Sequence, residues 1–242
     1  MNQIIELITS HRTYRHFDEN HTLSAEEVAA ILAAAQQAPS WMNGQHYSII
    51  RLTDRTLRAE FGALFPANPQ LVSASECWVF VGDLHRMKLA SQAYGGSFDG
   101  AASTESTLVM SIDAALAAQN AALAAESLGY GTCFVGAMRQ QVKSLIELLK
   151  LPHHTFPLFA LCIGKPSIEM QRKPRLPAHV VCCENAYRAD VDADLAAYEK
   201  VMTAFGEARE KFPWRDKFSR YYHQVSLPEN DKIWQEQGLK KK

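Results

Sequence analysis

The chain has 242 residues, of which 47% are apolar and 21% charged, a size and composition typical of a globular protein with one large domain or two small ones. A formal net charge of -1 and a pI of about 6.8 exclude the overall positive field that would hold a polyanion, so nucleic acid is not an expected partner. The five cysteines show no C-x-x-C spacing, which predicts reduced thiols. The N-terminal residues lack a basic segment followed by an apolar one, so a secretory signal is not expected and a cytoplasmic protein is.

The first forty residues predict two helices. Residues 2–9 are typical of a short helix. Ser24 and Glu27 form a capping box ahead of apolar residues at helical spacing, which predicts the start of a second helix. Pro39 is expected to end it, because proline lacks the backbone N–H that a helix interior requires.

Two strand patterns follow. Residues 47–52 predict a strand, and Asp54 is the expected N-cap of a helix that runs to about Leu64. Residues 77–81 are apolar throughout, which is typical of a strand buried on both faces.

A long apolar helix is predicted in the middle of the chain. Residues 110–128 are rich in alanine and apolar on most faces, which indicates burial on nearly all sides, and Gly129 is the expected stop. Small alanines also let another helix approach closely, so a place near a subunit interface is an alternative to core packing alone. A membrane span is not expected, because Asp113 and Glu126 interrupt the run and such groups are costly in hydrocarbon.

The remaining elements suggest the architecture. Residues 131–136 predict a strand and a glycine turn, residues 139–150 a helix, and residues 156–163 the last strong strand. Strands and helices thus intermingle, which predicts an α+β fold, a layered sandwich with one sheet flanked by helices, in a single domain over residues 1–242. The composition turns polar from about residue 190, so the C-terminal part is expected to be an excursion or an arm over a partner.

Two basic segments are candidates for binding an anion. Residues 11–16 hold two arginines, two histidines and a threonine, and the planar fork of arginine grips phosphate oxygens in pairs. Taken alone, this hexapeptide is equally well interpreted as a solvated basic turn. Residues 172–177 are held extended by two prolines. That segment alone is more typical of a surface loop, but two rigid cationic clusters together favour a shared phosphate ligand.

Four of the histidines outside these segments do not predict a metal centre. They lack the spacing to cysteines or carboxylates that zinc and related ions need. We therefore interpret them as surface groups or as hydrogen-bonded core groups. They are His46, His85, His153 and His154.

Six segments carry a resemblance to a known family. They are His11-Arg12-Thr13-Tyr14-Arg15, Ala38-Pro39-Ser40 with Gln45, Ala118-Gln119-Asn120-Ala121, residues 128–137, Leu149-Lys150-Leu151-Pro152 and Lys173-Pro174-Arg175-Leu176-Pro177. Each alone is a weak signal, but their joint order and spacing are specific. The chain resembles the nitroreductase superfamily, in particular its NADPH-dependent flavin reductase and oxygen-insensitive nitroreductase branch. The likeness covers essentially the whole chain and is weaker after Asp190.

The resemblance implies a fold, a cofactor and a reaction. The implied fold is a three-layer sandwich with a mostly antiparallel sheet, in an intertwined homodimer with two FMN molecules at the subunit interface, each site lined by both chains. The implied reaction is a ping-pong cycle in which NADPH gives its hydride to flavin N5 and nitroaromatics, quinones or flavins are then reduced. No catalytic side chain and no metal are expected, because the flavin does the chemistry. Nucleic acid and membranes are not expected partners.

Carried over residue by residue, the resemblance assigns contacts to the phosphate and to the ring. The basic turn holds the FMN phosphate, over which Lys173 and Arg175 close, and Arg15 lies near the pyrimidine edge, where a cation stabilises the charge of the reduced ring. A loop after Pro39 approaches from the other side, and the backbone N–H near Gly136 points at N5. The implied FMN contacts are His11, Arg12, Thr13, Tyr14, Arg15, Ser40, Asn43, Gln45, Asn68, Phe134, Val135, Gly136, Ala137, Lys173 and Arg175.

The resemblance also implies a site for the reductant. Arg209 and Arg215 match in spacing the arginines of a loop that reads the 2'-phosphate of NADPH. The alternative is a solvated charged face, since acidic residues are mixed with the basic ones here.

Several positions depart from the family pattern. Thr13 replaces serine and keeps its hydroxyl, whereas Asn68 replaces glutamine and is one methylene shorter. Phe134 replaces a tyrosine of the family pattern, and Ala137 replaces a glycine. Trp41 replaces a serine, and we weigh two interpretations equally: an aromatic group that narrows the pocket or stacks on the substrate, or a merely buried tryptophan. Two other functions stay open, a flavin reductase that supplies free reduced FMN and a non-catalytic FMN-binding protein.

Overall fold

The computed structural model describes residues 2–206 and 211–241. The chain divides into two compact units, of which the second is Gln171–Pro228 and the first comprises the residues before and after it. A single domain with an excursion from about residue 190 stays a prediction. The composition of the sequence did not indicate that the chain returns to the first unit at Glu229.

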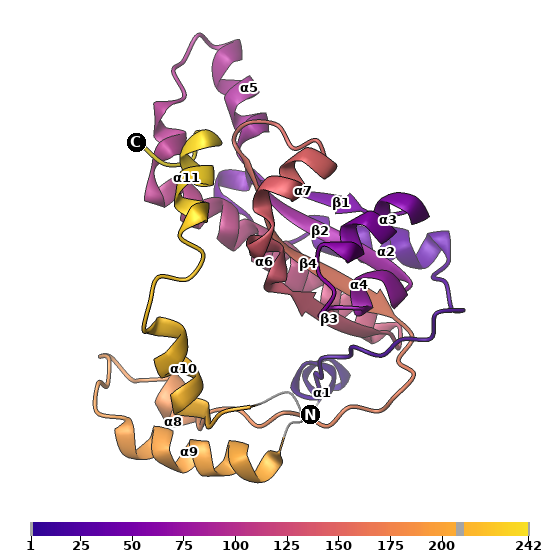
Figure 1. Cartoon of the computed structure of the whole chain (residues 1–242), viewed down its shortest axis with the longest axis vertical. Helices are drawn as coiled ribbons and strands as arrows, with labels where there is room; N and C mark the ends of the chain where they lie inside the picture. Colours follow the sequence, from indigo (N-terminus) through magenta and orange to yellow (C-terminus); the bar gives the residue numbers. More distant parts are fainter. Residues whose placement is uncertain (1, 207–210, 242) are drawn as a thin grey trace. The chain divides into compact units, whose positions relative to one another are not determined.

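A four-stranded antiparallel sheet forms the centre of the first unit (Figure 1). Its strands are β1 (Tyr47–Arg51), β2 (Glu76–Asp83), β3 (Gly131–Val135) and β4 (Thr155–Gly164), in the spatial order β1-β2-β4-β3. The central strands β2 and β4 are buried along almost their whole length, which explains their continuous apolar runs. The edges of the sheet are β1 and β3.

Helices cover both faces of the sheet. The helices of the first unit are α1 (Gln3–Thr9), α2 (Ala25–Gln36), α3 (Arg55–Ala63), α4 (Gln70–Ser73), α5 (His85–Ala93), α6 (Thr104–Ser127), α7 (Val142–Leu148) and α11 (Glu229–Glu236), with the 3-10 turns η1 (Trp41–Asn43), η2 (Asp99–Ala102) and η3 (Gly136–Gln140). One buried cluster joins α2 and α6 to the sheet, and a second joins α3, α4 and α7 to its other face (Figure 1). The predicted α+β sandwich is therefore confirmed.

The local signals that predicted helix ends are present in the structure. The Ser24 Oγ accepts a hydrogen bond from the Glu27 N–H at 3.2 Å, and the Ser24 N–H donates to Glu27 Oε2 at 2.8 Å, which completes the capping box. Asp54 caps α3 through the Leu57 N–H at 2.8 Å. Gly129 follows α6 with a φ of +86°, a left-handed conformation that favours glycine.

Two helix boundaries differ from the prediction. The helix α6 begins at Thr104, before the predicted residue 110, because its first turns are polar and the apolar pattern starts only where the helix becomes buried. The predicted helix 139–150 is α-helical over Val142–Leu148 alone, since the preceding residues form the 3-10 turn η3. The sequence patterns also missed α5 and η2, which lie near the surface.

The helix α6 is the core helix of the first unit. It is long and apolar enough to cross a membrane by length and composition, but the core helix of a folded protein meets the same test. It packs against α2 and against all four strands, through fully buried alanines that allow close approach. Its outer face carries exposed Leu108, Ile112 and Leu116, four residues apart and therefore on one stripe.

Three of the five cysteines form a row in the core. Cys77 on β2 and Cys133 on β3 are both register partners of Cys162 on β4, and all three are buried. A hydrogen bond with Cys77, together with burial, raises the pKa of Cys162 well above its usual value. These thiols are thus small apolar core groups, as predicted, whereas Cys182 is exposed.

The second unit is small and helical. It contains α8 (Ala178–Val181), α9 (Asp192–Phe205) and α10 (Trp214–Tyr222). The Trp214 ring packs edge-on against Tyr198 and Phe218, with centroids 5.3 and 4.9 Å apart. Arg215 ties α10 to α9 through Glu199. An aromatic contact and an ion pair therefore join the two main helices of this unit.

Candidate functional site

The basic turn after α1 lies along the start of β3. The Tyr14 N–H donates to the Thr132 carbonyl at 2.9 Å, and Thr13 forms a parallel bridge with Thr132. Gly131 permits this approach, because a Cβ at that position would lie 2.7 Å from the Tyr14 ring. The turn is thereby fixed to the sheet edge instead of moving freely in solvent.

A buried carboxylate orients the first histidine of the turn. Glu126, near the end of α6, accepts from His11 Nδ1 at 2.7 Å and from the Thr132 hydroxyl at 2.6 Å through the same oxygen. The Glu126 side chain is 9% exposed. Two donors on one nearly buried carboxylate hold the imidazole against β3.

Arg12 has an unused donor in a place suited to an anion. Its guanidinium pairs with Glu169, whose side chain is 75% exposed, and its Nε is buried without a hydrogen-bond partner among the described residues. A hydrogen bond with Tyr14, and then the charge of Glu169, raise the pKa of Arg12. The group is therefore permanently cationic, with one orphaned donor and one partner that solvent or a stronger anion can displace.

The far end of β3 carries the predicted ring contacts. The Phe134 ring is 38% exposed and meets Phe159 edge-on at 5.8 Å, whereas Val135 is buried. Gly136 begins the turn η3 and is exposed, beside the guanidinium of Arg139. The basic turn and the glycine turn thus sit at the two ends of one strand, about 13 Å apart at about 3.3 Å per residue.

Asn68 is linked to β3 through its neighbour Gln70, which makes the direct contact with the strand. Gln70 is 2% exposed, and its amide donates to Asn68 Oδ1 at 3.3 Å and to Cys133 Sγ at 3.7 Å. Sequence reasoning missed Gln70. The only signal was a glutamine inside a short, mostly apolar helix, which is too common a pattern to single out.

The loop with Ser40, Asn43 and Gln45 is closed on itself and strained. The Gln45 N–H donates to Ser40 Oγ at 3.1 Å, and the Gln45 amide donates to the Asn43 carbonyl at 3.1 Å. Met42, Asn43 and Gln45 all have φ near +50°, which costs of order 1–3 kcal/mol for each such residue. Such strain persists only where surrounding contacts hold the loop, and it is typical of functional loops.

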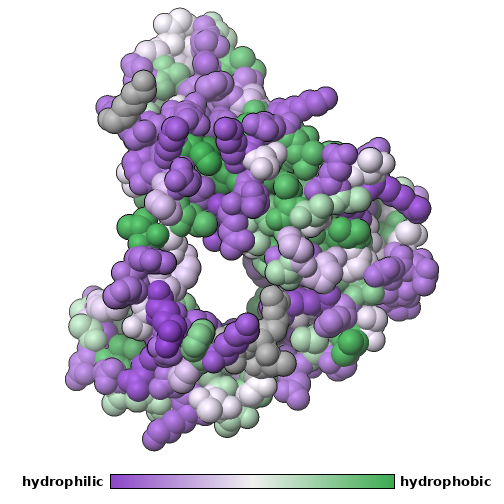
Figure 2. Space-filling view, in the orientation of Figure 1, coloured by the Kyte–Doolittle hydropathy of each residue, from purple (hydrophilic) through white to green (hydrophobic). Residues whose placement is uncertain are grey.

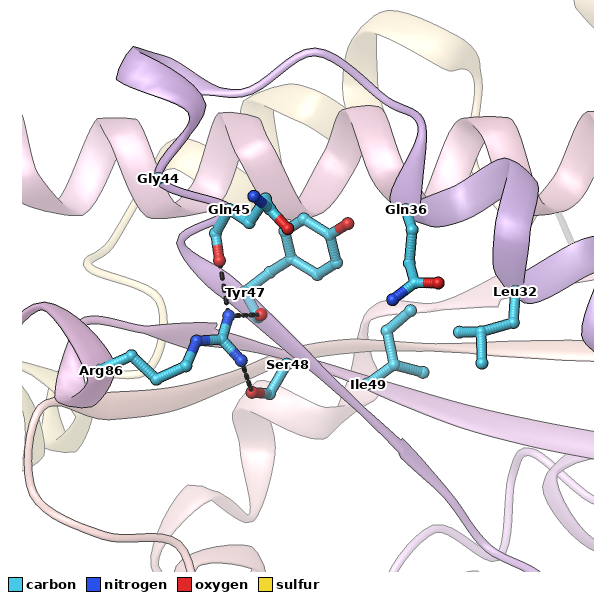
Figure 3. Close-up of a pocket in the computed structure, with 8 residues that line it drawn as sticks. All are labelled: Leu32, Gln36, Gly44, Gln45, Tyr47, Ser48, Ile49 and Arg86. Carbon is cyan, nitrogen blue, oxygen red and sulfur yellow. Dashed lines mark hydrogen bonds between the residues drawn. The ribbon is translucent and has the colours of Figure 1, made fainter.

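The loop ends beside an open pocket. This cavity of about 500 Å³ is lined by residues of α2, the loop, β1 and α5, namely Leu32, Gln36, Gly44, Gln45, Tyr47, Ser48, Ile49 and Arg86 (Figure 3). Arg86 points its guanidinium at the chain beyond the loop and donates to the Gln45 carbonyl at 2.6 Å, to the Tyr47 carbonyl and to Ser48 Oγ at 3.1 Å (Figure 3). With these donors committed to β1, the arginine is a structural support for the loop.

Trp41 is exposed near the start of this loop, directly after Ser40. Its exposed fraction is 59%, and that of Met42 is 85%. Of the two interpretations from sequence, the buried tryptophan is wrong for this chain. The reason is the positive φ at the two residues after it, which turns the chain sharply and leaves the indole outside the core.

Within one chain, the loop and the basic turn lie far apart. Asp113 of α6 accepts hydrogen bonds from the loop, whereas Glu126, more than three turns later on α6, accepts from His11. That separation is about 20 Å along the helix at about 1.5 Å per residue. The loop also precedes β1, and the basic turn borders β3, at opposite edges of the sheet. One chain therefore does not bring the two predicted halves of the site together.

The remaining predicted contacts belong to the second unit. The Arg175 guanidinium donates to the Lys173 carbonyl at 2.9 Å, and the Tyr198 hydroxyl donates to the Pro174 carbonyl at 3.0 Å, so hydrogen bonds tie this loop to itself and to α9. Arg215 pairs with Glu199 at 3.3 Å and Asp192 at 3.5 Å. Arg209 lies outside the described residues. The roles of these four basic residues stay predictions.

Matches to known proteins agree with this arrangement. The nitroreductase family profile matches residues 8–165, and the profile of its C-terminal domain matches residues 173–242. The chain belongs to the nitroreductase family. The second match begins almost where the second compact unit begins, at Gln171.

Relatives of this nitroreductase family member are similar over nearly their whole length. The oxygen-insensitive NADPH nitroreductase of Salmonella typhimurium is 37% identical, over 95% of this chain and 93% of the relative. An FMN reductase (NADPH) of Bacillus subtilis is 33% identical, over 99% and 91%. The solved structure of an NADPH:FMN oxidoreductase from Vibrio harveyi in complex with NAD+ is 32% identical, covers all of both chains and superposes with a TM-score of 0.90.

The residues of this family member fit an FMN phosphate. The buried Arg12 Nε, which has no hydrogen-bond partner among the described residues, offers a donor at one end of β3, close in sequence to the oriented His11 imidazole. The exposed backbone at Gly136 offers a close approach at the other end. A phosphate at the first place and a flat ring at the second match the chemistry of these donors.

Proposed function

We propose that this chain reduces nitroaromatics, quinones or flavins with electrons from NADPH, in a ping-pong cycle at an FMN site built from two copies of the chain. The family and its named relatives make it an oxidoreductase with FMN as cofactor and NADPH as reductant. Bound FMN supplies the redox chemistry, by taking a hydride at N5 and passing electrons to the second substrate. The protein supplies binding, orientation and charge.

The proposal rests chiefly on where the two halves of the predicted site lie. A mononucleotide is shorter than the distance between the basic turn and the loop at Trp41, so one chain cannot contact a single FMN with both. Two copies related by a two-fold axis can contact one FMN with both elements if the exposed faces of their α6 helices pack antiparallel. The loop of one copy then approaches the basic turn of the other. The apolar stripe of Leu108, Ile112 and Leu116 is a suitable surface for this contact.

Each half of the site then has its own task. His11, Arg12 and Thr13 bind the phosphate and fix the position of the cofactor, while Arg15 offers a cation near the pyrimidine edge. The exposed Phe134 and the Gly136 backbone border one side of the ring. Ser40, Asn43 and Gln45 of the partner border the other side, and Lys173 and Arg175 keep their assigned role at the phosphate.

The surface supports a protein that works in water. In the view of Figure 2, apolar residues form separate patches within a largely hydrophilic surface. Three cysteines are reduced and enclosed in the core. We therefore propose a cytoplasmic enzyme, where NADPH is available and thiols stay reduced.

An anaerobic titration tests the function directly. We expect the purified protein to be yellow and to lose its flavin absorbance on addition of one equivalent of NADPH, and to recover it on addition of a nitroaromatic compound or a quinone. Free FMN as the acceptor tests the second candidate, a flavin reductase, which the FMN reductase relatives favour. A colourless protein that stays colourless with excess FMN would refute the site; a yellow protein that NADPH does not bleach would refute the activity.

The choice of NADPH over NADH provides a second prediction. If Arg209 and Arg215 bind the 2'-phosphate, replacing either by alanine lowers the ratio of kcat/KM for NADPH to that for NADH by about tenfold or more, the effect of one charge-assisted contact. Arg220→Ala is the matched control for Arg215→Ala, because Arg220 lies on the same helix and also pairs with an acidic residue, Asp216, but is not assigned to the 2'-phosphate. An unchanged ratio in Arg209→Ala and Arg215→Ala would reject the assignment.

A further inference from the structure

A buried carboxylate holds both ends of the loop that carries Trp41. Asp113 is 2% exposed and accepts three hydrogen bonds from this loop. The Trp41 N–H donates to Oδ1 at 3.0 Å, and the His46 N–H donates to Oδ2 at 3.1 Å. The His46 ring adds a third bond, from Nδ1 to the same Oδ2 at 2.8 Å. The carboxylate thus contacts the first residue of the loop and its last residue before β1.

These bonds maintain a conformation that the loop would not adopt alone. Three residues with positive φ lie between the two attachment points, and none is a glycine. The loop's own hydrogen bonds, such as Gly44 N–H to the Trp41 carbonyl at 2.8 Å, close it but do not attach it to the rest of the protein. Asp113 and Arg86 make that attachment, from α6 and α5 respectively. The result is an indole held on the outside of the molecule.

We propose that Asp113 and His46 are positioning residues for the electron acceptor, and that they act through Trp41, which determines specificity for flat aromatic acceptors. The chemistry favours this role because an exposed indole, on a backbone attached to the core, offers a face on which an electron-poor ring can stack. A buried carboxylate with three donors is a costly way to secure a surface loop unless the position of the loop matters. This inference rests on the proposed function, since it concerns the acceptor of that reaction.

The test compares an aromatic acceptor with one that cannot stack. Trp41→Ala and Asp113→Asn should each raise KM for a nitroaromatic acceptor by about fivefold, the loss of one ring-stacking contact, with kcat nearly unchanged. KM for hexacyanoferrate, which has no flat ring, should not change.

A double variant separates positioning from general stability. If Asp113 acts through Trp41, the effects of Trp41→Ala and Asp113→Asn on KM are not additive, and the double variant resembles either single variant. Additive effects would overturn the proposal. Thr155→Val is the matched control, because it removes a buried hydrogen bond to the Pro152 carbonyl, 2.6 Å long, in another loop. It should leave the ratio of the two KM values as in the wild type.

His46 keeps the proposal testable if Asp113→Asn does not fold. His46→Leu removes the ring donor and should raise KM for the aromatic acceptor selectively. His46→Asn retains a side-chain N–H near the same place, so its KM for this acceptor should be close to the wild-type value. A ratio of the two KM values that stays at its wild-type value in Trp41→Ala would overturn the specificity role. A wild-type protein without flavin, or one that NADPH does not bleach, would instead refute the proposed function itself, so the two failures are distinguishable.

Discussion

Arg12→Ala should lose FMN, with an affinity about 10- to 100-fold weaker than that of the wild type. One charge-assisted hydrogen bond contributes about 1.5–3 kcal/mol, and tenfold in affinity corresponds to about 1.4 kcal/mol. Arg12 has the geometry for such bonds, since its Nε is buried without a partner among the described residues, and Glu169, which pairs with its guanidinium, is exposed. Flavin absorbance after dialysis, and fluorescence titration of the apoprotein with FMN, measure the change.

Two further variants serve as controls for this prediction. Arg51→Ala removes an arginine of similar exposure that is bound in a bidentate pair with Glu76, at 2.8 and 3.1 Å, and FMN affinity should be unchanged. Glu169→Gln removes the carboxylate that competes for Arg12, so FMN affinity should stay equal or rise. A yellow Arg12→Ala protein with wild-type affinity would show that the phosphate is bound elsewhere.

Ile112→Glu should give a colourless monomer. Ile112 is the middle residue of the exposed stripe on α6, and burying an unpaired carboxylate in a subunit interface costs about 3–5 kcal/mol, enough to weaken dimerisation at least 100-fold. Each chain holds only half of the predicted site, so the loss of the dimer should also release FMN. Light scattering after size-exclusion chromatography measures the mass, and absorbance measures the flavin.

The control for this prediction is matched in exposure. Leu89 on α5 is 54% exposed, the same fraction as Ile112, and lies outside the α6 stripe. Leu89→Glu should therefore remain a yellow dimer. Circular dichroism should show both variants folded, because neither side chain belongs to the buried core. A dimeric, yellow Ile112→Glu protein would exclude this face of α6 as the interface.

Local sequence determined most of the regular elements. The capping box at Ser24, the Asp54 cap and the left-handed Gly129 follow from hydrogen bonds and backbone preferences within a few residues, so a linear reading finds them. The buried strands are recognisable for a similar reason, because a strand enclosed on both faces must be apolar throughout. The polar start of α6 escaped prediction because periodicity marks burial, not helix.

The chemistry of the basic turn could also be proposed from sequence, but its partners could not. Arginine and histidine in residues 11–16 predict an anion site whatever the fold. Glu126, which orients His11, and Asp113, which holds the loop at Trp41, appeared in the sequence only as charges that interrupt an apolar helix. Their roles depend on contacts with residues more than sixty positions away, and hydrogen bonds at such separation leave no local pattern.

By itself, the sequence of this protein therefore determined the elements, the family resemblance and the kind of ligand. Only the tertiary structure decided that the loop at Trp41 and the turn at Arg12 lie at distant points of α6 and at opposite edges of one sheet. The physical reason is that spacing along a chain fixes neighbours within a helix or strand, whereas strand order and helix packing fix which distant residues meet. For this chain, that order is the reason why the site we propose requires a second copy.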